Sequence, residues 1–89
     1  MYVVRLIGIM RVGEVPDEFR GFVEFQARLE QRHPADWELV ALLIVEGTES
    51  VFPVFLKDLD LSRVEETLSR QETVMPPEVR RELSAFLAR

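Results

Sequence analysis

Apolar residues run almost without interruption over residues 37–46, and a second, shorter apolar run follows at 51–56. Ten residues are too few to cross a membrane, and a run of this length and composition indicates a buried β-strand. Gly47 lies between the two runs, which is typical of a β-hairpin. Pro53 has no N–H to give to a neighbouring strand, so it favours an edge strand or a bulge over a central position.

Both faces of the first of these strands are apolar. Successive side chains of a strand point to opposite faces, so residues 37–46 separate into two alternating sets. A strand with one face in water would carry polar residues all along that face, and neither set does. We therefore expect both faces of this strand to be covered. The sets are Trp37, Leu39, Ala41, Leu43 and Val45 on one face, and Glu38, Val40, Leu42, Ile44 and Glu46 on the other.

The N-terminal third of the chain predicts a strand followed by a helix. Residues 2–12 are mostly apolar and predict the first strand, and the turn at 13–16 leads into a helix over 17–32. Pro34 ends this helix, because the residue before a proline is pushed out of the helical region. At 100° per residue one wide stripe forms, on which Gln26 and His33 also fall. Its apolar members are Phe19, Phe22, Val23, Phe25 and Leu29.

The C-terminal third predicts two more helices. Ser62 and Glu65 have the spacing of a capping box at the start of a helix over 61–71. Residues 73–75 are either a loop or a short fourth strand. A last helix begins near residues 76–77, where two prolines suit a first turn. Its apolar stripe is narrow and consists of Val79, Leu83, Phe86 and Leu87.

The order β-α-β-β-α-(β)-α over a single domain, residues 1–89, predicts an α+β fold. The expected architecture is a two-layer sandwich, as a ferredoxin-like or split βαβ variant. The split plan places the third strand centrally, and Pro53 argues against that position unless the proline sits at a bulge.

A homodimer through the sheet face is the expected assembly. If the helices at 17–32 and 61–71 share one face, the other face is apolar in the middle and charged at its margins, like an interface. Either the last helix or a second copy covers this face, and the narrow stripe of that helix favours the copy. Two sheets packed in this way are similar at fold level to the dimeric α+β barrels. The apolar residues are Val3, Ile7, Ile9, Val40, Leu42 and Ile44, and the marginal ones are Arg5, Arg11, Glu38 and Glu46.

Composition narrows the function classes. A net charge of −5 disfavours nucleic-acid binding, which needs a basic stripe. The chain has no cysteine and begins directly in a strand without a signal peptide, so we expect a cytoplasmic protein with no membrane segment. Phosphate loops, zinc patterns and calcium loops are absent from the sequence, which predicts no metal and no cofactor. One lysine and no asparagine are compatible with a thermophilic source, or with a GC-rich genome.

Candidate site residues are few. His33 is the single histidine, and Glu30, three residues before it, is placed to orient its ring as a general base; capping of a helix end is the simpler interpretation. Gln26 and Trp37 with Tyr2 are the other candidates for lining a pocket between the first helix and the sheet. Arg5 or Arg11 would receive an anionic group there.

Two functions follow. The first is a homo-oligomeric binding or regulatory module without catalysis, because no chemical constellation stands out. The alternative is a small dimeric enzyme or small-molecule-binding protein that uses the pocket beside the first helix.

Overall fold

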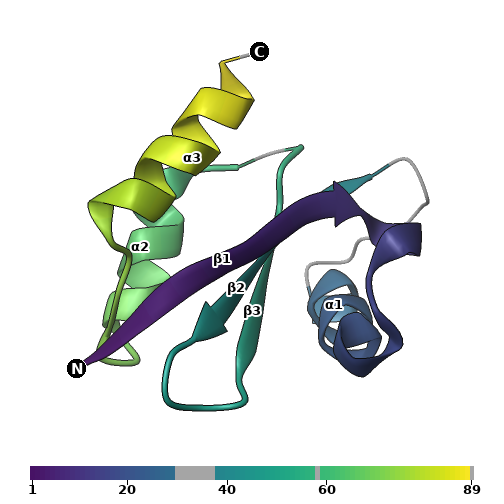
Figure 1. The fold of residues 1–89 in the computed structure, drawn as a ribbon, viewed down its shortest axis with the longest axis horizontal. Coiled ribbons are helices and arrows are strands. Elements are labelled where there is room, and N and C mark those ends of the chain that lie inside the picture. The colour runs from purple at the N-terminus through teal and green to yellow at the C-terminus, as the bar shows by residue number, and fades with distance from the viewer. Residues whose placement is uncertain (30–37, 58, 89) are drawn as a thin grey trace.

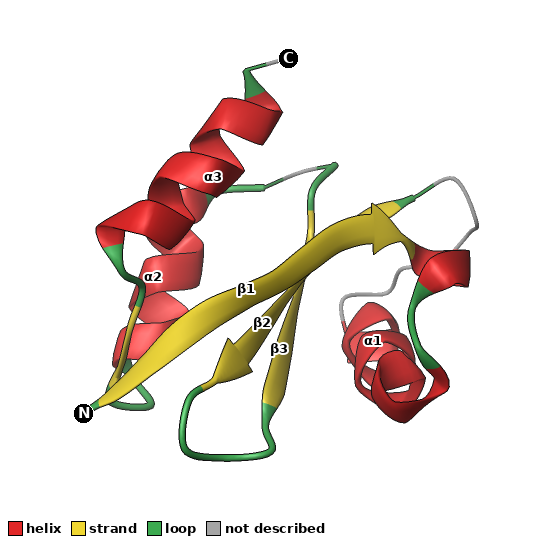
Figure 2. Ribbon diagram, in the orientation of Figure 1, coloured by secondary structure: helices red, strands yellow, loops and turns green. Residues whose placement is uncertain are grey.

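The computed structural model describes residues 1–29, 38–57 and 59–88, and it shows an α+β fold (Figures 1 and 2). None of the helices in this part of the chain is long and apolar enough to cross a membrane. The described residues form the predicted strands and helices, and of the two alternatives for residues 73–75 the structure has the short strand. In chain order they are β1 (Tyr2–Arg11), the 3₁₀ turn η1 (Val12–Glu14), α1 (Asp17–Leu29), β2 (Leu39–Val45), β3 (Val51–Phe55), α2 (Leu61–Ser69), β4 (Thr73–Val74) and α3 (Pro77–Leu87).

The four strands form one mixed sheet in the order β3-β2-β1-β4. The pairs β1–β2 and β2–β3 are antiparallel, whereas β4 runs parallel to β1. The edge position that Pro53 predicted for the third strand is confirmed. A split βαβ plan would have placed that strand in the middle of the sheet.

The register explains why a proline is tolerated in β3. The N–H of Val45 donates to the carbonyl of Ser50 at 3.0 Å, which sets the phase of the β2–β3 ladder. By the alternation of an antiparallel pair, Val51, Pro53 and Phe55 then direct their backbone groups away from β2. The ladder between β2 and β3 therefore does not need the N–H that Pro53 lacks. Its absence also makes the free edge of β3 less able to pair with another strand.

The helices cover opposite faces of the sheet, with α1 on one side and α2 with α3 on the other (Figure 1). The expectation that the first two helices share one face is wrong. The chain leaves β1 through Val12 and Val15, which are buried on the α1 side and lead the helix onto that face. The α1-side cluster also holds Val23, Ala27, Val40, Leu42, Val51 and Phe55. The cluster under α2 and α3 includes Val4, Ala41, Leu43, Val54, Leu68, Val79 and Leu83.

The apolar face predicted for a dimer is thereby divided. Val40 and Leu42 are fully buried beneath α1 in the same chain. The register of β1 shifts between Leu6 and Gly8, so Ile9 turns to the α2–α3 side instead of staying with Ile7. The expected six-residue surface therefore does not exist as one exposed face.

The start of α2 differs from the predicted capping box. Asp60 is the N-cap, and its carboxylate accepts hydrogen bonds from the N–H groups of Ser62 at 3.1 Å and Arg63 at 3.3 Å. Glu65 is instead in an ion pair with Arg80 of α3, at 2.7 Å, which joins the two helices. The helix begins one residue before Ser62, so the spacing of the predicted box no longer applies.

Gly21 offers a direct test of α1. It lies inside the helix and is exposed, and a Cβ built on it meets no atom within 4 Å. Replacing Gly21 by alanine is therefore expected to raise the free energy of unfolding by about 0.5–1 kcal/mol, measured by urea denaturation. A loss of stability would show that α1 is not helical at this position.

Candidate functional site

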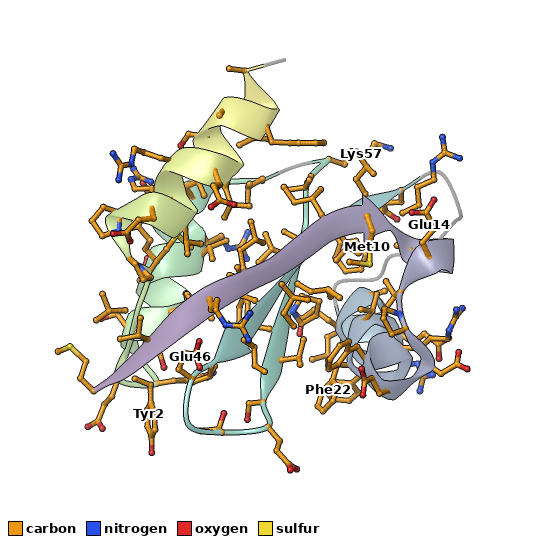
Figure 3. The ribbon with its side chains drawn as sticks, in the orientation of Figure 1. Tyr2, Met10, Glu14, Phe22, Glu46 and Lys57 are labelled. Atoms are coloured by element: carbon orange, nitrogen blue, oxygen red, sulfur yellow. The ribbon has the colours of Figure 1, made fainter. Side chains whose placement is uncertain are left out.

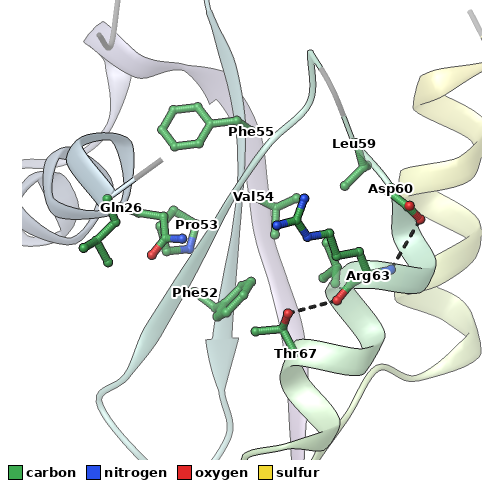
Figure 4. A pocket seen from close by; sticks show the side chains of 11 residues that line it. Gln26, Phe52, Pro53, Val54, Phe55, Leu59, Asp60, Arg63 and Thr67 are labelled. Atoms are coloured by element: carbon green, nitrogen blue, oxygen red, sulfur yellow. Dashed lines mark hydrogen bonds between the residues drawn. The ribbon is translucent and has the colours of Figure 1, made fainter. Parts of the chain in front are cut away.

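A pocket of about 520 Å³ opens over the free edge of β3, between α1 and α2 (Figure 4). Gln26 and Leu29 come from α1 and form one wall. The floor is made by residues 52–55 of β3, which include two phenylalanines and Pro53. Asp60, Arg63 and Thr67 from α2 and its cap form the opposite wall, so the pocket combines an apolar floor with polar sides.

Among the described residues that line the pocket, Arg63 is the positively charged one. Figure 4 shows its guanidinium reaching from α2 over β3, beside Val54. Within the described part of the chain no carboxylate lies within ion-pair distance of this guanidinium, although Asp60 is only three residues away. An arginine beside an apolar floor, with no acidic partner among these residues, is suited to a carboxylate or another planar anion.

The other polar groups on the α2 wall already have partners. One oxygen of Asp60 accepts the two capping hydrogen bonds of α2. The hydroxyl of Thr67 donates to the carbonyl of Arg63 at 2.9 Å. These bonds hold the first turns of α2 in place, and so fix the backbone from which Arg63 projects.

Gln26 faces this wall from the other side. It is half-buried on α1, next to the fully buried Ala27, and its amide points toward Pro53 in Figure 4. An amide carries both a hydrogen-bond donor and an acceptor, so a glutamine at this place suits a ligand with either an acceptor or a donor group.

The structure brings one of the predicted site residues, Gln26, to this pocket. Tyr2 is exposed at the start of β1, Arg11 is exposed at its end, and Arg5 makes a 2.7 Å ion pair with Glu46. None of these three lines the pocket. The remaining candidates, Glu30, His33 and Trp37, lie outside the described residues.

Arg63 could not have been chosen from the sequence. It is one of ten arginines, and helix spacing alone places it on an exposed side of α2. Its relevance depends on β3 being an edge strand with α1 and α2 on either side of it. Pro53 was the one available signal, because it indicated a free edge.

A second exposed region lies on the α1 side of the sheet, on the part that α1 leaves uncovered. We call it the open sheet face and define it by Val3, Arg5, Ile7, Ile44, Glu46 and Val74. Val3 and Val74 are 42% exposed and Ile7 is 36% exposed. Figure 3 shows Glu46 on this part of the molecule and Phe22, which is 46% exposed, projecting from α1.

Comparison with protein families covers almost the whole chain. Residues 2–87 match a family described as a domain of unknown function, DUF749. No curated protein and no solved structure matches the chain.

Proposed function

Because the chain belongs to the DUF749 family, whose description names no activity, we propose from the geometry that it is a small-ligand-binding module. The ligand occupies the pocket at the free edge of β3 and carries an anionic group and an apolar body. One observation carries this proposal: the Arg63 guanidinium projects over an apolar floor without a described acidic partner.

The size of the pocket supports binding of a small molecule. A volume of about 520 Å³ lies in the range of small-molecule sites. Arg63 would hold the anionic group, while Phe52 and Pro53 contact the apolar body. Gln26 stands on the opposite wall.

We favour binding over catalysis for this pocket. Among the described residues that line it, the titratable side chains are Asp60 and Arg63. An arginine remains protonated, and the Asp60 carboxylate caps α2, so neither is placed as a general base. A cytoplasmic location is part of the same proposal and is supported by the lack of cysteine.

Hydrocinnamate, a carboxylate with a phenyl ring, is a suitable first probe. We expect it to bind with a dissociation constant of about 1 mM, the range for a ligand of this size. Titration followed by amide NMR spectra should shift the signals of Gln26, Arg63 and Thr67. Replacing Arg63 by methionine keeps the aliphatic stem and removes the charge, so it should weaken binding about tenfold.

Arg70 provides the matched control. It is exposed on α2 beyond the pocket, where it pairs with Glu66 at 2.8 Å. Arg70→Met should leave hydrocinnamate binding unchanged within about twofold. If the two arginine variants bind equally well, or if the shifted signals lie elsewhere, Arg63 is not the anion site and the proposal fails.

The open sheet face supports a second candidate, self-association as a homodimer. Its exposed Val3, Ile7 and Val74 surround the Arg5–Glu46 ion pair. In a two-fold interface the same patch meets itself, so Arg5 of one copy would meet Glu46 of the other. This surface is smaller than the face expected from the sequence, because α1 covers Val40 and Leu42.

Light scattering at micromolar to submillimolar concentration tests the dimer, which should have twice the chain mass of 10.4 kDa. Val3→Glu buries a charge in the interface and should raise the dimer dissociation constant at least about tenfold. Leu87→Glu is the control, because Leu87 is 41% exposed, similar to Val3, but lies on α3. A single-chain mass at all concentrations would exclude the homodimer.

A further inference from the structure

The free edge of β3 offers a hydrogen-bond acceptor within the pocket. Pro53 directs its backbone carbonyl away from β2, and it lines the pocket. Because proline has no N–H, the Pro53 carbonyl stands without the donor that any other residue would place beside it. Among the described residues no group donates a hydrogen bond to this carbonyl. Within the pocket the strand edge therefore favours a ligand that brings N–H donors.

The α2 wall, in contrast, favours a ligand that brings a hydrogen-bond acceptor. The guanidinium of Arg63 offers only donors, so it requires an acceptor, and its planar fork matches a carboxylate. Figure 4 shows this guanidinium on one side of β3 and Pro53 on the other. A ligand that satisfies both carries a carboxylate together with a group rich in N–H donors.

The negative charge of Asp60 also favours a ligand that carries a positive group. One of its oxygens caps α2, yet the side chain remains exposed at the rim of the pocket. A purely anionic ligand would be repelled by Asp60 while it is attracted by Arg63. A ligand with a positive group as well as a carboxylate avoids this conflict.

Resting on the proposed binding function, we propose that the pocket accepts a zwitterionic α-amino acid with a large apolar side chain. Its carboxylate pairs with Arg63 and its ammonium donates to the Pro53 carbonyl. Its side chain lies against Phe52 and Leu29. Pro53 thus has a role in recognition beyond the protection of the sheet edge, because its ring removes the donor that would compete with the ammonium.

Three ligands of similar shape separate the contributions of the two charged groups. Phenylalanine has both, hydrocinnamate lacks the ammonium, and phenethylamine lacks the carboxylate. Titrations by amide NMR at one ionic strength should give phenylalanine the highest affinity, with each analogue weaker by about tenfold or more. In Arg63→Met, phenylalanine should fall to the affinity of phenethylamine, while phenethylamine itself changes less than about twofold. Arg70→Met should leave all three affinities unchanged.

The results distinguish this inference from the function on which it rests. If hydrocinnamate binds at the pocket as tightly as phenylalanine, the ammonium has no partner there; the inference is then wrong and the proposed function stands. If a phenylalanine-containing dipeptide binds about tenfold more tightly than the free amino acid, the ligand is a peptide and the inference is also wrong. If none of these ligands shifts the pocket signals, both proposals fail. Unfolding midpoints of the variants equal to that of the unmodified chain would exclude a folding defect as the cause.

Discussion

Replacing Leu42 by alanine should lower the free energy of unfolding by about 3 kcal/mol, within the usual range of about 2–5 kcal/mol for a buried leucine. Leu42 is 0% exposed and lies in the cluster that joins the sheet to α1. The substitution removes buried apolar surface. It also leaves a cavity between β2 and α1, because the other packing contacts of these two elements hold them in place. Denaturation with urea, monitored by circular dichroism, gives this difference directly.

Leu29 provides a control within α1. It is 63% exposed, so Leu29→Ala removes the same atoms from a site that is largely in water. Its effect should stay within about 0.5 kcal/mol. Equal losses from the two substitutions would show that α1 does not bury Leu42.

Leu83→Ala should have a similar cost, about 2–4 kcal/mol, on the opposite side of the sheet. Leu83 is 0% exposed on α3 and packs in the cluster that contains Leu68 of α2 and Val4 of β1. This expectation depends on α3 covering its sheet face, which the narrow apolar stripe of that helix did not suggest. Thermal and chemical unfolding of the variant test it.

Leu87 is the matched residue on the same helix, one turn later and 41% exposed. Leu87→Ala should cost less than about 1 kcal/mol. The double variant of Leu42 and Leu83 should show additive losses within about 0.5 kcal/mol, because the two residues belong to separate clusters. A loss confined to the Leu42 variant would mean that α3 is not docked.

The local elements were predictable because their signals are local. Alternation and glycine placed the β2–β3 hairpin, and a proline before a helical pattern placed the start of α3. Pro53 also favoured an edge position or a bulge for β3, since its missing N–H restricts the position in any sheet, and the structure has the edge position. Asp60 replaced the predicted cap of α2 because short polar residues near a helix start compete for the same N–H groups, and their spacing alone does not decide which one caps.

The assignment of helices to faces was not predictable. Both alternating sets of β2 are apolar, so neither indicates which helix it meets. The bulge near Ile7 also reverses, halfway along β1, which side chains point to which face of the sheet. No single residue in the sequence predicts that reversal unambiguously. Because of these two ambiguities, the sequence predicted one exposed outer face. In the structure, α1 covers half of that face and the other half is open.

The candidate site was predictable only in part, for a related reason. Gln26 was identified because helical spacing placed it on the predicted apolar stripe of α1. Arg63 and the carbonyl of Pro53 enter the pocket through strand order and through α2 standing opposite α1. Such groups come together by tertiary structure, which no single periodic pattern contains.

Methyl contacts measured by isotope-filtered NMR on a mixture of labelled and unlabelled chains give the most direct test that one chain covers both faces of its own sheet. We predict contacts within a chain from Ala27 of α1 to Leu42 or Val51, and from Leu83 of α3 to Val4. No contact between chains should reach Leu42. If Leu42 instead contacts a neighbouring copy while Ala27 has no partner in the sheet, α1 does not cover this face and the pocket beside β3 does not form.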